Sequence, residues 1–222
     1  MHRFDVPLNL TAVPVIENFL GRQDELDQLW QHLRPTNSQP RKVAILHGLG
    51  GIGKTQLAIR FARSHKDDFT AIFWLSGKDR GTLLQSLSSV LPRLPRQSQN
   101  KKAALEEDVE QRAGHVLRWL ALDGNSRWLI IFVNIDQYLP VSGATGDAYD
   151  IAEFFPTADH SSILLTSRLQ GLTELRKSFQ LNRLESKDAI LLLLQSTRLS
   201  ARDTVSGLER NPGTKSSNTQ IQ

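Results

Sequence analysis

Cysteine is absent from this chain of 222 residues. Disulfide bonds, thiolate metal sites and cysteine nucleophiles are therefore excluded, in agreement with a reducing compartment. Long apolar runs are absent too, since none approaches the roughly 18 to 20 residues that a membrane-spanning helix requires. The opening residues Met1–Asp5 also lack the apolar core of a signal peptide. We expect a cytoplasmic protein without a membrane partner, whose stability comes from its hydrophobic core.

Motifs of hydrolytic and zinc chemistry are missing as well. The six histidines form no H-E-x-x-H pattern, and the sequence contains no paired-carboxylate or Ser/His/Asp arrangement that would predict such chemistry. His47 is expected to end a strand as a packing or hydrogen-bonding residue. The core is expected to contain Trp74, Trp119 and Trp128.

The positive charge of the chain does not predict nucleic-acid binding. The formal net charge is +4 and the isoelectric point is near 9.6, but Lys and Arg alternate with Asp and Glu along most of the chain. The densest basic stretch, residues 92–102, contains prolines and no aromatic residue that would stack on a base. We interpret it as a linker between helices.

Apolar and β-branched runs alternate with helical patterns, which predicts an α/β fold. The alternation favours a three-layer sandwich, with a mostly parallel five-stranded sheet and helices on both faces. The predicted strands are Val43–Leu46, Thr70–Leu75, Trp128–Val133, Ser162–Thr166 and Phe179–Leu181. The predicted helices are a segment ending near Leu33, then Thr55–Arg63, Arg80–Leu91, Ala103–Leu122, Ile151–Phe155 and Lys187–Leu199.

Three regions of the chain differ in composition. Residues 1–16 contain prolines and predict an extended arm, residues 17–200 form the domain, and the polar residues 201–222 predict a disordered tail. Within the domain, Tyr138–Asp150 is expected to form a loop near the ligand. Near the end of the domain, Ser186 is expected to cap a helix whose leucines form a buried face.

The stretch Gly48–Thr55, which reads GLGGIGKT, fits the phosphate-loop pattern G-x-x-x-x-G-K-[ST] at every fixed position. It lies between an apolar run and a helical pattern, so backbone N–H groups would point at one anion. Lys54 is expected to reach the β- and γ-phosphates and Thr55 to offer its hydroxyl to Mg²⁺. The predicted contacts to a nucleotide are made by Gly48, Gly50, Gly51, Ile52, Gly53, Lys54, Thr55 and Gln56.

Four motifs in one order resemble the NB-ARC family of signalling NTPases, which belongs to the STAND class. They are Phe19-Leu20-Gly21-Arg22-x-x-Glu25-Leu26, the phosphate loop, Trp128–Phe132 and Ile163–Arg168. The sequence of residues His47–Gly51 is similar to that of the fungal cell-death and incompatibility receptors within this family. The resemblance covers roughly residues 15–200.

The resemblance implies a switch that holds ADP at rest and ATP when active, with protein partners or self-assembly. It implies that the phosphate-loop strand lies beside the strand that ends at Thr166. Leu20 and Arg22 would lie against the adenine edge, and Arg168 would sense the terminal phosphate, for which the planar guanidinium fork is suited. The alternative interpretations are a surface charge at a helix entry for Arg22 and a surface ion pair for Arg168.

The chain departs from the family where Mg²⁺ would be ordered. The family pattern Asp-Asn-x-Asp is here Val133-Asn134-Ile135-Asp136, and valine offers no oxygen ligand. The metal would depend on Thr55, water, phosphate oxygens and Asp136, and we expect hydrolysis to be weakened a hundredfold or more. Asp136 is the candidate catalytic residue, orienting water or metal, but it can equally be a turn residue.

The sequence also ends before the helical and winged-helix subdomains of the family. We expect a fragment, an altered gene product, or a chain that works by joining other proteins. Three functions remain: a nucleotide switch with slow or absent hydrolysis, a competent ATPase or small-molecule kinase that uses Asp136, and an interaction domain independent of nucleotide.

Overall fold

The computed structural model describes residues 3–10, 13, 21–36, 40–95, 107–137, 149–174 and 177–194. By contact clustering the chain divides into two units, one made of Met1–Ile16 and Arg22–Arg183, the other of Glu17–Gly21 and Leu184–Gln222. Several predictions lie outside the described residues: Leu20, most of the 138–150 loop, the 201–222 tail, the end of the leucine-rich helix, residues 96–102 of the predicted linker and the start of the helix predicted over Ala103–Leu122. No helix among the described residues is long and apolar enough to cross a membrane.

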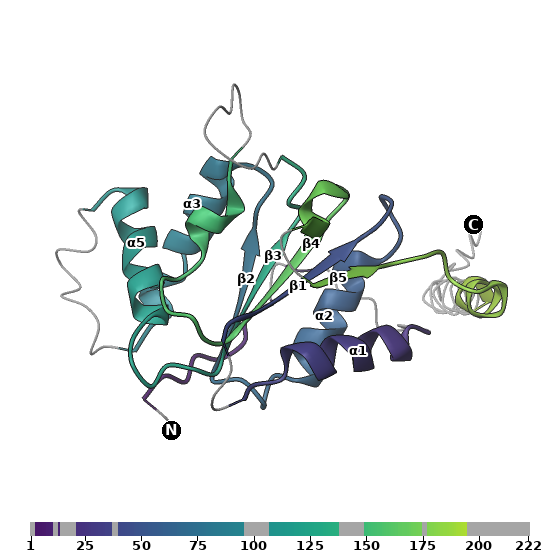
Figure 1. The fold of residues 1–222 in the computed structure, drawn as a ribbon, viewed down its shortest axis with the longest axis horizontal. Coiled ribbons are helices and arrows are strands. Elements are labelled where there is room, and N and C mark those ends of the chain that lie inside the picture. The colour runs from purple at the N-terminus through teal and green to yellow at the C-terminus, as the bar shows by residue number, and fades with distance from the viewer. Residues whose placement is uncertain are drawn as a thin grey trace, which may run out of the picture. The chain divides into compact units, whose positions relative to one another are not determined.

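The larger unit is built on one parallel sheet in the order β2-β3-β4-β1-β5 (Figure 1). Its strands are β1 (Lys42–His47), β2 (Ala71–Ser76), β3 (Trp128–Val133), β4 (Ser162–Ser167) and β5 (Lys177–Gln180). Every residue of β3 and β4 is buried, as expected of parallel strands covered on both faces. The predicted α/β fold with five strands is confirmed, and β1 pairs with β4 throughout, from Lys42 opposite Ser162 to His47 opposite Ser167.

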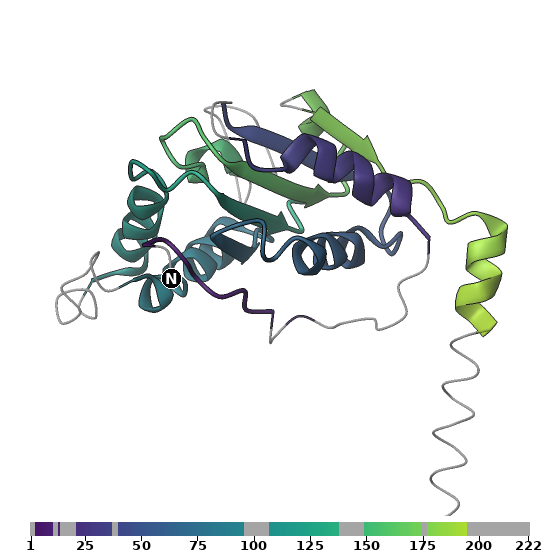
Figure 2. The same ribbon diagram turned by 90° about the horizontal axis from the view of Figure 1, so that it is seen from below.

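Helices cover both faces of this sheet (Figures 1 and 2). On one face, α1 (Gln23–Leu33) and α2 (Lys54–Ser64) pack together and contact β1 and β4. On the other face, α3 (Arg80–Ser88) and α5 (Val109–Leu120) pack on each other, and α3 contacts β2. The short 3₁₀ helices are η1 (Leu91–Arg93), η3 (Ile151–Phe154) and η4 (Gly171–Glu174).

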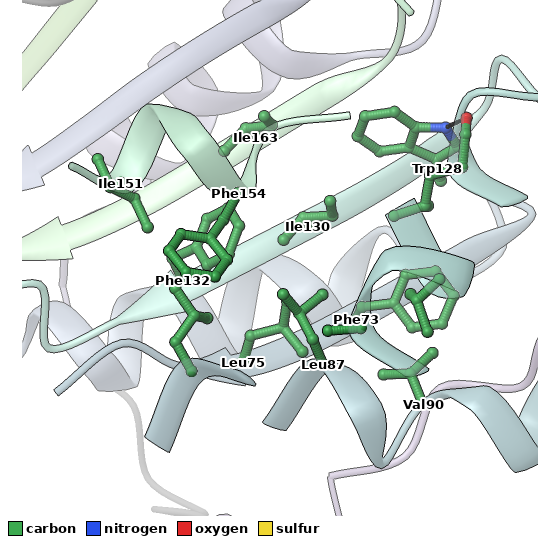
Figure 3. Packing of buried hydrophobic residues seen from close by; sticks show 14 of the residues in the cluster. Phe73, Leu75, Leu87, Val90, Trp128, Ile130, Phe132, Ile151, Phe154 and Ile163 are labelled. Carbon is green, nitrogen blue, oxygen red and sulfur yellow. Dashed lines mark hydrogen bonds between the residues drawn. The ribbon is translucent and has the colours of Figure 1, made fainter. Parts of the chain in front are cut away.

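The core on the α3 and α5 face is formed by alternate strand residues. Ile130 and Phe132 of β3 and Phe73 and Leu75 of β2 point into it, and Leu87 of α3 meets them (Figure 3). The alternation follows from the period of two in a strand. Burying a large apolar side chain stabilises the fold by about 1.5 to 3 kcal/mol, so this cluster holds the strand ends in place.

Two helices differ from their predictions: one is shorter than predicted, and the other is a 3₁₀ helix. The helix predicted over Arg80–Leu91 ends at Ser88, because Pro92 lacks the N–H that would continue it. The helix predicted near Ile151 is the 3₁₀ helix η3, whose N-cap Asp150 accepts a bond from Ala152 N. Carboxylates also cap α3 and α5, where Asp79 accepts from Thr82 N and Asp108 from Gln111 N.

The N-terminal segment lies along the free edge of β2. Val6 N donates to Thr70 O at 2.8 Å and Val6 pairs with Ala71 in parallel. The ring of Phe4 packs edge-on against Trp119. The described part of the predicted extended arm is therefore a short edge extension of the sheet.

The smaller unit contains a helix over residues 186–194. Ala189 N bonds to Glu185 O, so Ser186 lies inside the first turn and is not the N-cap that the sequence predicts. The prediction of a buried leucine face is also wrong, because Ile190, Leu191, Leu193 and Leu194 are exposed. Helical spacing of apolar residues does not specify which surface will cover the apolar face that they form. Among the described residues, none covers this face of the 186–194 helix.

Candidate nucleotide-binding site

The loop over residues 48–53 connects β1 to α2 and needs glycine at two tight positions. Gly48 has φ of 150°, and a Cβ there would lie 2.7 Å from Leu181 O. Gly53 has φ of 99° and occupies the N-cap position of α2, a left-handed conformation that glycine adopts without a steric cost. The loop therefore turns sharply into the N-terminus of a helix, where backbone N–H groups attract anions.

Lys54, the first residue of α2, folds back over this loop. Its ammonium donates to Gly48 O at 2.7 Å and Leu49 O at 2.9 Å. Burial lowers the pKa of Lys54 from its ordinary value of 10.5, the Asp136 carboxylate opposes this, and the Arg168 charge adds to it. The lysine, Asp136 and Arg168 thus form one electrostatic group although they come from three different segments.

A cavity of about 520 Å³ lies over the loop. It is at the carboxyl ends of parallel strands, the edge where ligands bind in open α/β sheets. The cavity is lined by Gly50, Gly51, Ile52, Gly53, Lys54, Thr55, Gln56, Lys78, Asn134, Asp136, Thr166, Ser167 and Arg168.

Hydrogen bonds fix the cavity wall where β3 and β4 end. Asn134 has φ of 61°, and its N–H donates to Thr166 Oγ1 at 3.1 Å. Ile135 N donates to Thr166 O at 3.0 Å, and the Ser167 hydroxyl donates to Ile135 O. The chain after β3 is therefore folded against the end of β4, which brings Asp136 to Arg168.

Both oxygens of Asp136 bond to Arg168. Oδ1 accepts the main-chain N–H at 2.8 Å and Oδ2 accepts Nε–H at 2.7 Å. The Arg168 side chain is 63% exposed. Arg168 thus lines the cavity and is paired with Asp136, while its contact with a terminal phosphate remains a prediction.

Val133 lies in the sheet and offers nothing to a metal. It is 5% exposed and pairs with Ser76 of β2. The described residues contain no group of three or more His, Cys, Asp or Glu placed to hold a metal ion. The lining residues fit Mg²⁺ poorly, because the Asp136 carboxylate is engaged and Thr55 remains as the hydroxyl expected to contact the ion.

Arg22 lies beside the loop and does not line the cavity. Its guanidinium donates to Ile52 O at 3.0 Å, Asn182 O at 2.8 Å and Glu25 Oε1 at 3.0 Å. The side chain is 5% exposed, so Arg22 is a buried clamp rather than a surface charge. Contact of Arg22 with an adenine remains a prediction.

The structure thus brings the predicted residues 50–56, Asp136 and Arg168 together at one cavity, whereas Gly48 does not line it. Sequence reasoning missed Lys78, Asn134, Thr166 and Ser167 as lining residues. Lys78 could have been found, because it follows a predicted parallel strand and such strands end at one edge of the sheet.

Comparison with known proteins agrees with this geometry. The model of the AAA ATPase domain matches residues 18–179. The chain is 30% identical over 169 residues to a nucleotide-binding leucine-rich repeat (NLR)-like protein of the fungus Hyaloscypha variabilis. That alignment covers 71% of this chain and 16% of the relative, so the chain spans a small part of the relative's length.

Among solved structures, Cdc6p of Pyrobaculum aerophilum matches with a TM-score of 0.54 at 12% identity. The match covers 85% of this chain and 53% of that protein, and at this identity it shows the fold alone. The chain belongs to the AAA ATPase domain family, as an NB-ARC-like P-loop NTPase that resembles the fungal NLR-like protein.

Proposed function

We propose that the chain is an ADP- and ATP-binding switch module of NB-ARC type, from a signalling NTPase of the cell-death or immunity kind. The observation that carries this proposal is the cavity over the phosphate loop, which both Lys54 and Arg168 line. A nucleotide polyphosphate fits such a site, because the loop N–H groups and the two cationic side chains can contact phosphate oxygens in the same cavity. Arg168 comes from the end of β4 and so would respond to the terminal phosphate.

We also propose that hydrolysis is slow or absent. Val133 cannot order a metal, and Asp136 bonds to Arg168 through both oxygens. A base or water-orienting residue needs a lone pair directed at the nucleophile. One lone pair on each Asp136 oxygen is already used by Arg168, which argues against a competent ATPase or kinase.

A second candidate function is an interaction domain independent of nucleotide. It is supported by the exposed apolar side chains of residues 190–194, since apolar patches are common at protein interfaces. The resemblance to NLR-type proteins favours protein partners or self-assembly in the cytoplasm. This candidate predicts partner binding that does not change when nucleotide binding is removed.

Thermal unfolding of the purified chain with ADP or ATP, each with and without Mg²⁺, tests the proposal. A nucleotide that binds the folded state at 100 times its dissociation constant stabilises it by about 2.7 kcal/mol, so the midpoint should rise. Lys54→Ala should abolish the rise. Lys66→Ala is the matched control, because the Lys66 side chain is 59% exposed and does not line the cavity.

The outcomes separate the candidates. A rise that Lys54→Ala removes and Lys66→Ala keeps supports the switch module. Turnover well above background that Asp136→Ala removes would favour the enzyme. A folded protein whose midpoint moves with neither nucleotide would refute the switch and leave the interaction domain.

A further inference from the structure

The cavity over the phosphate loop is richer in positive charge than the sequence motifs predict. Its charged lining residues are Lys54, Lys78 and Arg168 against Asp136. Two of these cations already form hydrogen bonds within the protein. Lys54 donates to loop carbonyls and Arg168 donates to Asp136. Lys78 belongs to none of the sequence motifs.

Lys78 lies next to the position where a metal-ordering carboxylate is missing. Ser76 of β2 pairs with Val133 of β3, and Gly77 N donates to Val133 O at 2.8 Å. Lys78 is the next residue of the chain, so it begins directly beside the end of β3. A charged residue just after β2 therefore adjoins the end of β3, where Val133 offers no charge.

The backbone on both sides of Lys78 is anchored. The buried Tyr149 hydroxyl donates to Gly77 O, and Asp79 caps α3 through Thr82 N and Thr82 Oγ1, each at 2.7 Å. The Lys78 side chain itself makes no ion pair or hydrogen bond with the described residues. The Lys78 charge contributes to the lowered pKa of its neighbour Asp79, but the two form no ion pair, so no described residue takes up the donors of the Lys78 ammonium.

The oxygen ligands that would hold Mg²⁺ are scarce at the same place. Val133 has none, each Asp136 oxygen already accepts one hydrogen bond from Arg168, and Thr55 is the hydroxyl expected to contact the ion. In phosphate-loop sites the metal bridges phosphate oxygens and neutralises their charge. An ammonium can supply part of that neutralisation, because charge-assisted hydrogen bonds to phosphate are strong and lysine is a common phosphate ligand.

We infer that Lys78 supplies the counter-charge that Mg²⁺ supplies in other phosphate-loop sites, so that this chain binds a nucleotide polyphosphate without a divalent cation. The inference rests on the proposed function, since it specifies how the same site holds its nucleotide. The alternative is that Lys78 is a solvated surface lysine at the cavity mouth.

Calorimetric titration with ATP tests the inference, once in EDTA and once in excess Mg²⁺, at one fixed ionic strength. Wild-type affinity should change less than about threefold between the two conditions. Lys78→Met keeps the length of the side chain and removes its charge, and it should weaken binding in EDTA about tenfold or more. Lys66→Met, in the turn between α2 and β2 and away from the cavity lining, should leave the affinity unchanged.

A converse variant restores the missing carboxylate. Val133→Asp combined with Lys78→Met should bind ATP at least tenfold more tightly in Mg²⁺ than in EDTA, because the new carboxylate can order the metal. If the buried substitution prevents folding, as thermal unfolding will reveal, the comparison of Lys78→Met with Lys66→Met still decides the matter.

The failure of the inference is distinct from the failure of the proposed function. Wild-type binding that is lost in EDTA, or a Lys78→Met variant that binds like Lys66→Met, overturns the role of Lys78 and keeps the nucleotide site. Absence of ATP and ADP binding in every condition, in a folded protein, overturns the proposed function itself.

Discussion

Asp136 holds Arg168 through its main chain and its side chain at once, with Oδ1 2.8 Å from the backbone nitrogen and Oδ2 2.7 Å from Nε. This pair joins the end of β3 to the end of β4. Because the arginine side chain is 63% exposed, solvent screens the pair and its contribution to stability is at most about 1 kcal/mol. Asp136 is the one carboxylate among the described lining residues of the cavity, and the pair places it beside a cation that lines the same cavity.

The Asp136→Asn variant should bind ATP about threefold or more tightly than the wild type. The amide keeps an acceptor for Arg168 N–H, while the negative charge that repels phosphate is removed. Calorimetric titration at constant ionic strength measures the effect. Weaker binding, or a tenfold loss of ATP turnover, would instead show that the carboxylate serves the nucleotide or its hydrolysis.

Arg22→Ala should destabilise the fold by about 1 to 3 kcal/mol in urea unfolding. The variant leaves the part-buried Ile52 O without its donor, which costs up to about 1 to 3 kcal/mol, whereas the exposed Asn182 O can bond to water instead. Arg22→Lys should recover little, since an ammonium does not reproduce the planar fork that reaches three acceptors.

Arg80→Ala is the matched control for Arg22→Ala. Arg80 also pairs with a glutamate, Glu110, at 2.8 Å, but the two side chains are 50% and 62% exposed. Its loss should cost less than about 1 kcal/mol. Equal effects of the two substitutions would contradict the role of Arg22 as a buried clamp.

Gly77→Ala should cost at least about 2 kcal/mol of unfolding free energy. An added Cβ would lie 2.0 Å from Ile135 Cδ1 and 3.0 Å from the Tyr149 hydroxyl, and overpacking of this kind forces the backbone to shift. Gly171→Ala is the control, because a Cβ there meets nothing within 4 Å. If both variants have the unfolding free energy of the wild type, the side chains around Gly77 can move to accommodate a methyl group, which would contradict the prediction.

The sequence predicts the sheet well because its strands are buried on both faces. A run such as Trp128–Val133 is apolar throughout, as expected of a strand buried on both faces. The glycine pattern of the phosphate loop also predicts that a strand directly precedes the loop. Strand order follows only from the family resemblance, since no residue pattern encodes which parallel neighbours pair. The structure supplies it through the pairing of β1 with β4.

The candidate site is less predictable, because many of its contacts use backbone atoms. Arg22 reaches the carbonyls of Ile52 and Asn182, and every residue has a carbonyl, so spacing gives no signal for these bonds. The same holds for the exposed leucines near residue 190, whose partner surface no local pattern specifies. Motifs predict where chemistry is possible, and tertiary contacts decide which groups are already engaged.

Stability should fall as the pH drops below about 6.5. His47, the last residue of β1, has its pKa lowered from 6.5 by burial and then by the charge of Lys54. The unfolded chain therefore binds a proton at a pH where the folded chain does not, so the stabilising contribution is complete above the unfolded pKa and is lost as the pH falls toward the folded one. The slope is at most about 1.4 kcal/mol per pH unit for one proton.

Urea unfolding between pH 5 and pH 7 isolates this contribution from that of the cap carboxylate. Asp79, whose pKa hydrogen bonds from Thr82 lower from 3.8, loses its stabilising contribution only at more acidic pH. His47→Leu should remove the slope between pH 5 and 6.5. Lys54→Met should reduce it without removing it, because burial is the larger cause and persists.

Two outcomes would contradict this prediction. A slope that remains unchanged in His47→Leu would assign the proton uptake to another group. Equal slopes in the wild type and Lys54→Met would mean that the Lys54 charge does not act on His47.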